Sequence, residues 1–142
     1  MDAGLLILRI GLGLVVLIFG CQKMFGAFGG QGYPATIEFM TKTLHIHPVF
    51  ANLSVVAEFF GSLGVIFGLL TPVASLGLAA NFAVAAYFNL QRPGLEKTFL
   101  RDNSDNLIRF ALPCVLFFLA VAILVMGAGK YSVDARLFRR GK

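Results

Sequence analysis

Two polar residues at the end of an apolar run carry the strongest chemical signal in this sequence. Gln22 and Lys23 close a run of apolar residues that begins at Gly4, and a glycine-rich segment follows them. Glu58 lies inside a second apolar run. A carboxyl in an apolar segment is costly unless it is paired, protonated or hydrated, and it marks a functional site by default. We therefore take Lys23 and Glu58 as the candidate catalytic pair.

The composition requires a membrane around these residues. Of the 142 residues, 58% are hydrophobic and 13% are charged, which is too little polar surface to coat a soluble globule. A bilayer core of about 30 Å needs about 20 apolar residues per helix. Four such runs are present, at about residues 4–26, 53–70, 72–90 and 106–129. We predict an all-α fold, an integral membrane four-helix bundle that forms a single domain over residues 1–142.

The connections between the runs define the topology. Only residues 70–72 join the two middle runs, so these helices form a tight antiparallel hairpin and both chain termini lie on one side of the membrane. In the first connection, Ile37, Met40 and Leu44 share one side of residues 34–44, away from the polar positions. This pattern is typical of a short interfacial helix that lies on the membrane surface.

The direction of each helix places several polar residues at one depth. The first and third helices end at the same membrane face at which the second and fourth begin. The expected cluster near this face consists of Gln22, Lys23, Glu58, Tyr87, Asn89 and Arg109. Lys23 is the expected partner of Glu58, with Arg109 as the other candidate. Two interpretations stay open: a structural ion pair that locks the bundle, or a pocket for a quinone headgroup or small anion whose substrate-binding residues are Gln22, Tyr87, Asn89 and Arg109.

Arg9 and the glycines are assigned structural roles. Arg9 lies near the opposite membrane face, where it either reaches the lipid headgroups as an anchor, the interpretation we favour, or pairs with Asp134. Gly20 lies on the same helix face as Arg9 and Lys23, where a small residue lets a neighbouring helix approach closely. The segment after Lys23 needs turns and close backbone approach, which we assign to Gly26, Gly29 and Gly30.

The histidines and cysteines give weaker signals. Without a nearby third ligand, His45 and His47 are expected to be polar residues at the interface, and we predict no metal site. Cys21 and Cys114 lie within apolar runs without C-x-x-C spacing, so buried thiols are expected rather than a redox pair.

The net charge of +5 comes from basic residues at helix ends and in the C-terminal tail. An anionic lipid surface accounts for this distribution, so we predict the lipid bilayer as a partner and no nucleic acid. The positive-inside rule favours cytoplasmic termini.

Three blocks of the sequence form a recognisable pattern. The first runs from residue 8 to residue 32 and contains Arg9, Gly20, Gln22, Lys23, Phe25, Gly26, Phe28, Gly29, Gly30 and Gly32. The second is the run from Ala57 to Gly61 followed by the run from Gly68 to Pro72, and the third spans Gly127 to Asp134. Together they resemble the DoxX family of small bacterial membrane proteins.

The resemblance implies a multi-pass protein of the bacterial cytoplasmic (inner) membrane linked to quinone and sulfur redox chemistry, because relatives act in thiosulfate:quinone oxidoreductase. Arg9, Gln22, Lys23 and Glu58 match the family's motif positions. The sequence shows no flavin, haem or iron–sulfur motif, so no covalent cofactor is predicted and the candidate cofactor is a quinone. Electrons would then pass directly between substrate and quinone or through a partner. The alternative is a non-catalytic accessory subunit of a larger membrane redox complex, so whether the chain is an enzyme stays undecided, and other membrane redox subunits are expected as partners.

Overall fold

The computed structural model describes residues 2–91 and 104–139, and this part of the chain contains helices and no strands. Four of its helices are long and apolar enough to cross a membrane: α1 (Asp2–Phe25), α3 (Pro48–Phe67), α4 (Thr71–Leu90) and α6 (Ser104–Met126). The predicted all-α membrane fold is confirmed. The start of α3 lies at Pro48 rather than at residue 53, because a proline suits the first helical turn and the His47 ring accepts a hydrogen bond from the Val49 N–H at 3.4 Å.

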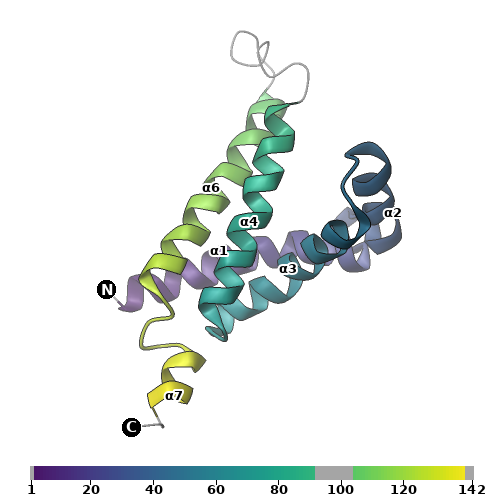
Figure 1. The fold of residues 1–142 in the computed structure, drawn as a ribbon. Coiled ribbons are helices and arrows are strands. Elements are labelled where there is room, and N and C mark those ends of the chain that lie inside the picture. The colour runs from purple at the N-terminus through teal and green to yellow at the C-terminus, as the bar shows by residue number, and fades with distance from the viewer. Residues whose placement is uncertain (1, 92–103, 140–142) are drawn as a thin grey trace.

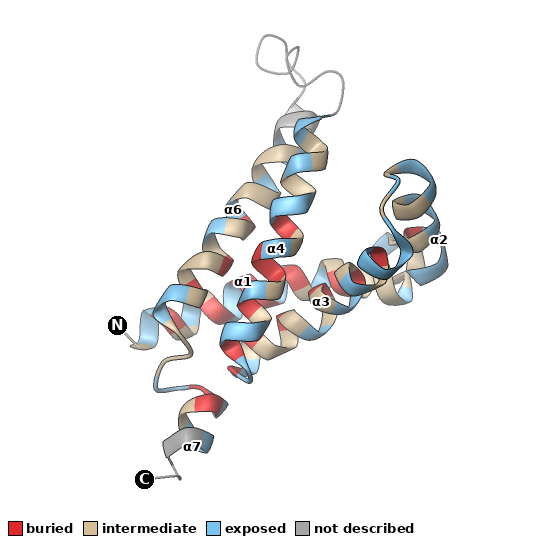
Figure 2. Ribbon diagram, in the orientation of Figure 1, coloured by how far each residue is buried: buried red, intermediate tan, exposed pale blue. Residues whose placement is uncertain are grey.

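The long helices pack as two antiparallel pairs. α1 packs along α3, α4 packs along α6, and α3 and α4 also contact each other. Figure 1 shows the α1–α3 pair crossing the α4–α6 pair, with the two pairs diverging from the α3–α4 turn. The apolar core lies at the crossing, where buried segments of the long helices meet (Figure 2). Its buried members are Leu12, Val16, Val65, Leu78, Ala79, Phe82, Leu116, Ala120 and Ile123.

The connection between α1 and α3 contains the predicted short helix. It consists of η1 (Ala27–Gly29), α2 (Gly32–Glu38) and a π-helical turn, η2 (Phe39–Thr43). Lys42 and Glu38 form an exposed ion pair at 2.6 Å across one helical turn of this segment. Met40 and Leu44 instead line a cavity next to α3 and α4. The segment is therefore amphipathic, as its sequence pattern predicts.

Arg9 forms hydrogen bonds with the end of α3 and is not directed at the lipid headgroups. Its side chain is buried, with 1% of its surface exposed, and its guanidinium donates hydrogen bonds to the carbonyl oxygens of Val65 (2.9 Å), Ile66 (3.2 Å) and Ala128 (2.6 Å). Val65 and Ile66 lie in the last turn of α3, where carbonyl groups have no partner within the helix. The interpretation that we favoured from the sequence, a headgroup anchor, is wrong because backbone carbonyls inside the protein take up the N–H groups of Arg9.

Asp134 completes the other side of the same turn. It lies in the first turn of α7 (Val133–Arg139), and its carboxylate accepts hydrogen bonds from the N–H groups of Leu70 and Thr71, both at 2.8 Å. Gly68 adopts a left-handed conformation, and a side chain at this position would collide with Arg9 and Ser132. Among the ion pairs of the described residues there is none between Arg9 and Asp134. We call Arg9, Gly68 and Asp134, with the backbone groups that they contact, the turn network.

The start of α1 and the connection between α6 and α7 meet beside the turn network. Lys130, in the connection between α6 and α7, lies 3.3 Å from the Asp2 carboxylate at the start of α1. The start of α1 and the α6–α7 connection therefore lie at the same end of the molecule (Figure 1), and the prediction that both termini share one side of the membrane stays a prediction.

Candidate functional site

Lys23, Glu58 and Asn81 meet at a point between three helices. The Lys23 ammonium lies 2.5 Å from Glu58 Oε1, and the Asn81 amide nitrogen donates to the same oxygen at 2.6 Å. Lys23 lies in the last turn of α1, Glu58 in α3 and Asn81 in α4. Lys23 is thus the partner of Glu58, as the sequence predicted, whereas a catalytic role for the pair stays a prediction. We call Lys23, Glu58 and Asn81 the polar triad.

Gly20 sets the separation of the helices that carry the ion pair. A Cβ atom on Gly20 would lie 2.9 Å from the Cα atom of Phe59, closer than such atoms approach in proteins. Because Gly20 lies one helical turn before Lys23 and Phe59 follows Glu58, α1 and α3 approach closely beside the pair. In the loop that follows, a side chain on Gly30 would collide with the backbone of Gln22, and Gly26 and Gly29 adopt positive φ angles.

Within residues 2–91 and 104–139, one carboxylate oxygen of Glu58 has no hydrogen-bond partner. Only 2% of the Glu58 surface is exposed, and its Oε2 atom is buried without a partner among the described residues. The other oxygen accepts from both Lys23 and Asn81. The hydroxyl of Ser54 bonds to the Asn81 amide oxygen, which directs the amide nitrogen of Asn81 at Glu58. A buried acceptor without a donor costs about 1–3 kcal/mol, and more when it is charged.

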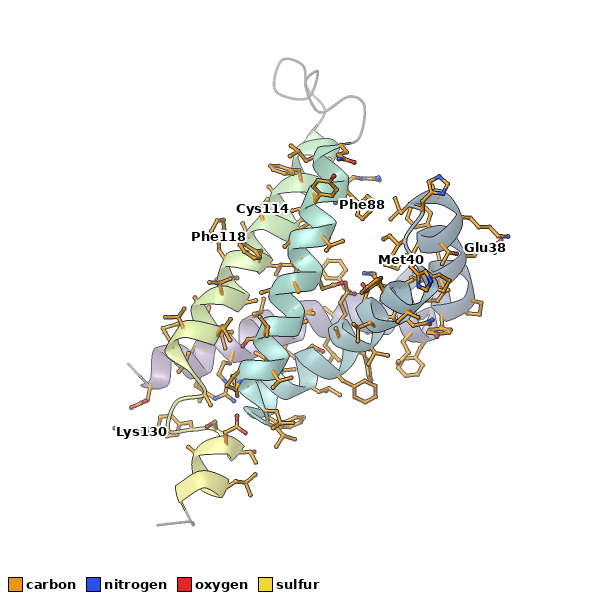
Figure 3. The ribbon with its side chains drawn as sticks, viewed as in Figure 1. Glu38, Met40, Phe88, Cys114, Phe118 and Lys130 are labelled. Carbon is orange, nitrogen blue, oxygen red and sulfur yellow. The ribbon has the colours of Figure 1, made fainter. Side chains whose placement is uncertain are left out.

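A cavity of about 640 Å³ lies beside the polar triad. It is bounded by α3, α4 and the segment from α2 to His47, and Figure 3 shows Phe88 of α4 and Met40 of η2 on its two sides. Phe50, Leu53 and Val84 line the cavity and also lie on the exposed surface, so it opens on the apolar outside of the helices. Its volume and mostly apolar lining with a few convergent polar groups are typical of a small-molecule site.

The structure brings together only part of the predicted cluster. Asn89 lines the cavity, and its amide donates to the Ala85 carbonyl at 2.8 Å. Three other predicted substrate-binding residues are not among the residues that line the cavity: Gln22, Tyr87 and Arg109. The prediction that all six side chains form one cluster is therefore wrong, because only Lys23, Glu58 and Asn89 line the cavity.

Each of these three residues has another environment. The Gln22 amide donates to the Phe28 carbonyl at 3.2 Å and so supports the glycine-rich loop. Tyr87 is exposed and packs edge-on against the Phe88 ring. Arg109 is exposed on α6, which packs mainly along α4. A shared depth does not bring side chains together when helix pairs diverge and when side chains point around the helix in different directions.

Asn81 and Ser54 are the site residues that the sequence prediction did not include. Asn81 is a polar residue in the middle of the third apolar run, which is itself a signal of a functional or paired group. Ser54 precedes Glu58 by four positions, so the two share one face of α3. The prediction ranked residues by depth near the membrane face, and this criterion excluded Asn81.

The remaining candidates from the sequence are two histidines and two cysteines. His45 and His47 both line the cavity, and His47 also caps α3. In the described ranges no three His, Cys, Asp or Glu side chains lie close enough to hold a metal ion. Cys21 and Cys114 are free thiols, each partly buried.

Comparison with known proteins identifies one relationship. The DoxX family model matches residues 4–90, a span that includes the polar triad and the cavity lining from α3 and α4. No curated protein and no solved structure matches the chain.

Proposed function

Since this chain belongs to the DoxX family of membrane proteins, we propose that its cavity binds the headgroup of a membrane quinone. The observation that carries the proposal is the polar triad in the wall of a cavity whose remaining lining is mainly apolar. A quinone has polar oxygens on one ring and an apolar tail, which matches this distribution.

The residues present fit such a molecule. Lys23 has three N–H donors, of which the pair with Glu58 uses one, so a further donor is available to a ring oxygen. Glu58 offers its second oxygen, and Phe50, Leu53 and Val84 offer apolar surface where the cavity opens toward lipid. A bound quinone would supply two-electron, two-proton redox chemistry. The protein's part is to orient the ring, keep it out of water and hold a carboxylate beside it.

A small anion suits the site less well. The charge of Lys23 is already balanced by Glu58 at 2.5 Å, and the remaining free oxygen of Glu58 belongs to a carboxylate. An anion such as thiosulfate would approach this like charge inside an apolar cavity, where the repulsion is poorly screened. We therefore place any sulfur donor outside this cavity, on a partner subunit or at another surface.

The chain then acts as a quinone-binding subunit of a redox assembly in the bacterial cytoplasmic membrane. The sequence has no flavin, haem or iron–sulfur motif, so electrons come from a substrate or from a redox partner. We propose cytoplasmic termini, which place the cavity nearer the periplasmic face. A C-terminal alkaline phosphatase fusion tests this orientation, and high phosphatase activity would contradict it.

Calorimetry with a short-chain quinone tests the proposed function. The purified protein in lipid nanodiscs is titrated with decylubiquinone, and in parallel with a short-chain menaquinone analogue and with thiosulfate. We expect saturable binding of a quinone and none of thiosulfate. Lys23→Met removes the donor to the ring oxygen and is expected to weaken binding about tenfold, as the loss of one charge-assisted hydrogen bond implies.

The matched control is Lys42→Met, because Lys42 also pairs with a glutamate but lies on the exposed side of the α2–η2 segment. It should leave quinone binding unchanged. Absence of saturable quinone binding, or equal affinities for wild type and Lys23→Met, would contradict the proposal and would favour the accessory-subunit hypothesis, in which the pair only joins α1 to α3. Binding of thiosulfate alone would favour an anion site.

A further inference from the structure

We infer that the cavity binds the reduced, hydroxyl-bearing form of its quinone more tightly than the oxidised form, an inference that rests on the proposed function. The feature that carries it is the uneven hydrogen bonding of Glu58. Oε1 accepts from Lys23 and Asn81, whereas Oε2 has no donor in the part of the chain that the structure describes. Glu58 lines the cavity, and a ligand donor that reaches Oε2 through a small turn of the carboxylate would satisfy this buried acceptor.

Asn81 and Ser54 have little freedom to satisfy this oxygen. Rotation of the Asn81 amide would point its oxygen, rather than its nitrogen, at the Glu58 carboxylate and would remove an existing bond at 2.6 Å. Ser54 occupies the other end of the Asn81 amide. If the Glu58 carboxylate rotates so that its two oxygens change places, one oxygen is again left without a donor. A carboxylate has acceptors only, so the missing partner has to be a donor.

The two forms of a quinone differ in this respect. The oxidised ring carries carbonyl oxygens, which accept from Lys23 but leave Glu58 Oε2 unpaired. A ring hydroxyl accepts from Lys23 and donates to Oε2 at the same time. A site with a buried unpaired polar group discriminates strongly between analogues that do and do not satisfy it. One hydrogen bond to a charged group corresponds to a preference of about 10- to 100-fold.

This preference has a consequence for electron flow. A site that binds the reduced form more tightly shifts the oxidised–reduced equilibrium of the bound molecule toward reduction, by the same factor as the ratio of affinities. The polar triad would thereby favour the quinone as an electron acceptor while it is bound here.

Paired titrations of wild type test the inference without any activity assay. Decylubiquinone and borohydride-reduced decylubiquinol are titrated anaerobically into the nanodisc-embedded protein, and the dimethyl ether of the quinol serves as a third ligand that has the same ring but no O–H donor. We expect decylubiquinol to bind at least tenfold more tightly than the other two. Equal affinities of quinol and dimethyl ether would overturn the inference and leave quinone binding intact, whereas absence of binding by all three would overturn the proposed function as well.

Glu58→Gln gives the sharper result. The glutamine oxygen keeps the acceptor for Lys23 and Asn81, and the amide nitrogen places a donor where Oε2 was, which suits a carbonyl. We expect the quinol preference to fall to unity or to reverse. Lys23→Met should weaken the binding of both quinol and quinone, because Lys23 donates a hydrogen bond to either form. The ratio of the two affinities should therefore change less than in Glu58→Gln. A Glu58→Gln protein that retains the full wild-type ratio contradicts the inference, and the wild-type ether comparison decides the matter if this variant does not fold.

Discussion

The two ends of the molecule use buried charges in opposite ways. In the turn network, Arg9 and Asp134 bond to backbone groups: the carbonyls of Val65, Ile66 and Ala128 accept from the guanidinium, and the N–H groups of two residues in the α3–α4 turn donate to the carboxylate. In the polar triad, one oxygen of Glu58 accepts two hydrogen bonds and the other has none among the described residues. Both carboxylate oxygens of Asp134 therefore have donors, whereas one oxygen of Glu58 has none; the other buried side-chain atom without a partner in the described part of the chain is the neutral hydroxyl of Thr71.

The surroundings of the two ends explain the difference. The α3–α4 turn lies within a membrane protein, and the last carbonyls of α3 and the first N–H groups of α4 need partners that lipid cannot supply. Arg9 and Asp134 supply them, so these charges stabilise the fold. At the other end the helix pairs diverge, and a cavity of about 640 Å³ lies beside Glu58, whose unpaired oxygen is buried next to it. Burial of a charge alone does not identify a binding site; incomplete hydrogen bonding beside a cavity does.

Arg9→Met is expected to give the largest loss of stability. It removes the donor from two carbonyls at the end of α3 and from Ala128, and leaves Asp134 as the only charge in the turn network. Breaking one side of a buried charged network costs about 3–5 kcal/mol. Reversible unfolding in mixed micelles with increasing SDS, followed by circular dichroism, measures the change. A loss below about 1 kcal/mol would contradict the role assigned to Arg9.

Asp134→Asn is expected to cost less and to reveal a pH dependence. Burial raises the pKa of the Asp134 carboxyl. Hydrogen bonds from the N–H groups of Thr71 and Leu70 and the charge of Arg9 lower the pKa, and together they outweigh burial, so the net pKa lies below the ordinary value of 3.8. A carboxyl with a depressed pKa contributes its stability fully above its ordinary pKa and loses it as the pH falls toward the folded value. We expect a loss of about 1–3 kcal/mol at neutral pH.

The pH profile provides the check on Asp134. The difference in unfolding free energy between wild type and Asp134→Asn should stay constant from neutral pH to about pH 5 and shrink below pH 3.8. A difference that persists unchanged at low pH would show that the carboxylate charge is not what stabilises the turn.

Glu58→Gln is expected to change stability by about 1 kcal/mol or less, while it changes ligand preference strongly. The glutamine keeps an acceptor for Lys23 and Asn81, and the substitution removes the unpaired charged oxygen. Lys23 retains access to water because a third of its side-chain surface, 33%, is exposed. The same SDS titration measures the change. A loss as large as that of Arg9→Met would make the polar triad a second structural lock and would remove the contrast between the two ends.

The long helices and the ion pair were predictable from the sequence for simple physical reasons. Four apolar runs of membrane-spanning length leave few alternatives to four helices. Lys23 and Glu58 lie on consecutive long helices that must run antiparallel, and Gly20 allows these helices to touch. Charge, depth and adjacency in the chain therefore all favoured the same pair.

The position of side chains around each helix was not predictable in the same way. Arg9 was assigned to the headgroups because its depth is shallow, but the carbonyl of Ala128 and the α7 segment cover it, and that segment has no periodic signal that fixes its position. Tyr87 and Arg109 lie on helices that diverge from α1 and α3. Asn81 joins the site because its direction on α4, rather than its depth, places it opposite Glu58.

Glu38→Gln is the smallest change and the strictest control for the polar triad. The Lys42–Glu38 pair has a distance of 2.6 Å against 2.5 Å for Lys23–Glu58, so the two pairs differ mainly in exposure. The hydrogen bond from Lys42 lowers the pKa of Glu38, yet water and salt screen such a pair, and we expect no measurable change in stability or in the ratio of quinol to quinone affinity. The measurement is the paired titration used for Glu58→Gln. Met40 and Leu44 of the same segment line the cavity, so a changed ratio in Glu38→Gln would mean that the α2–η2 wall, and not the unpaired oxygen of Glu58, sets the preference.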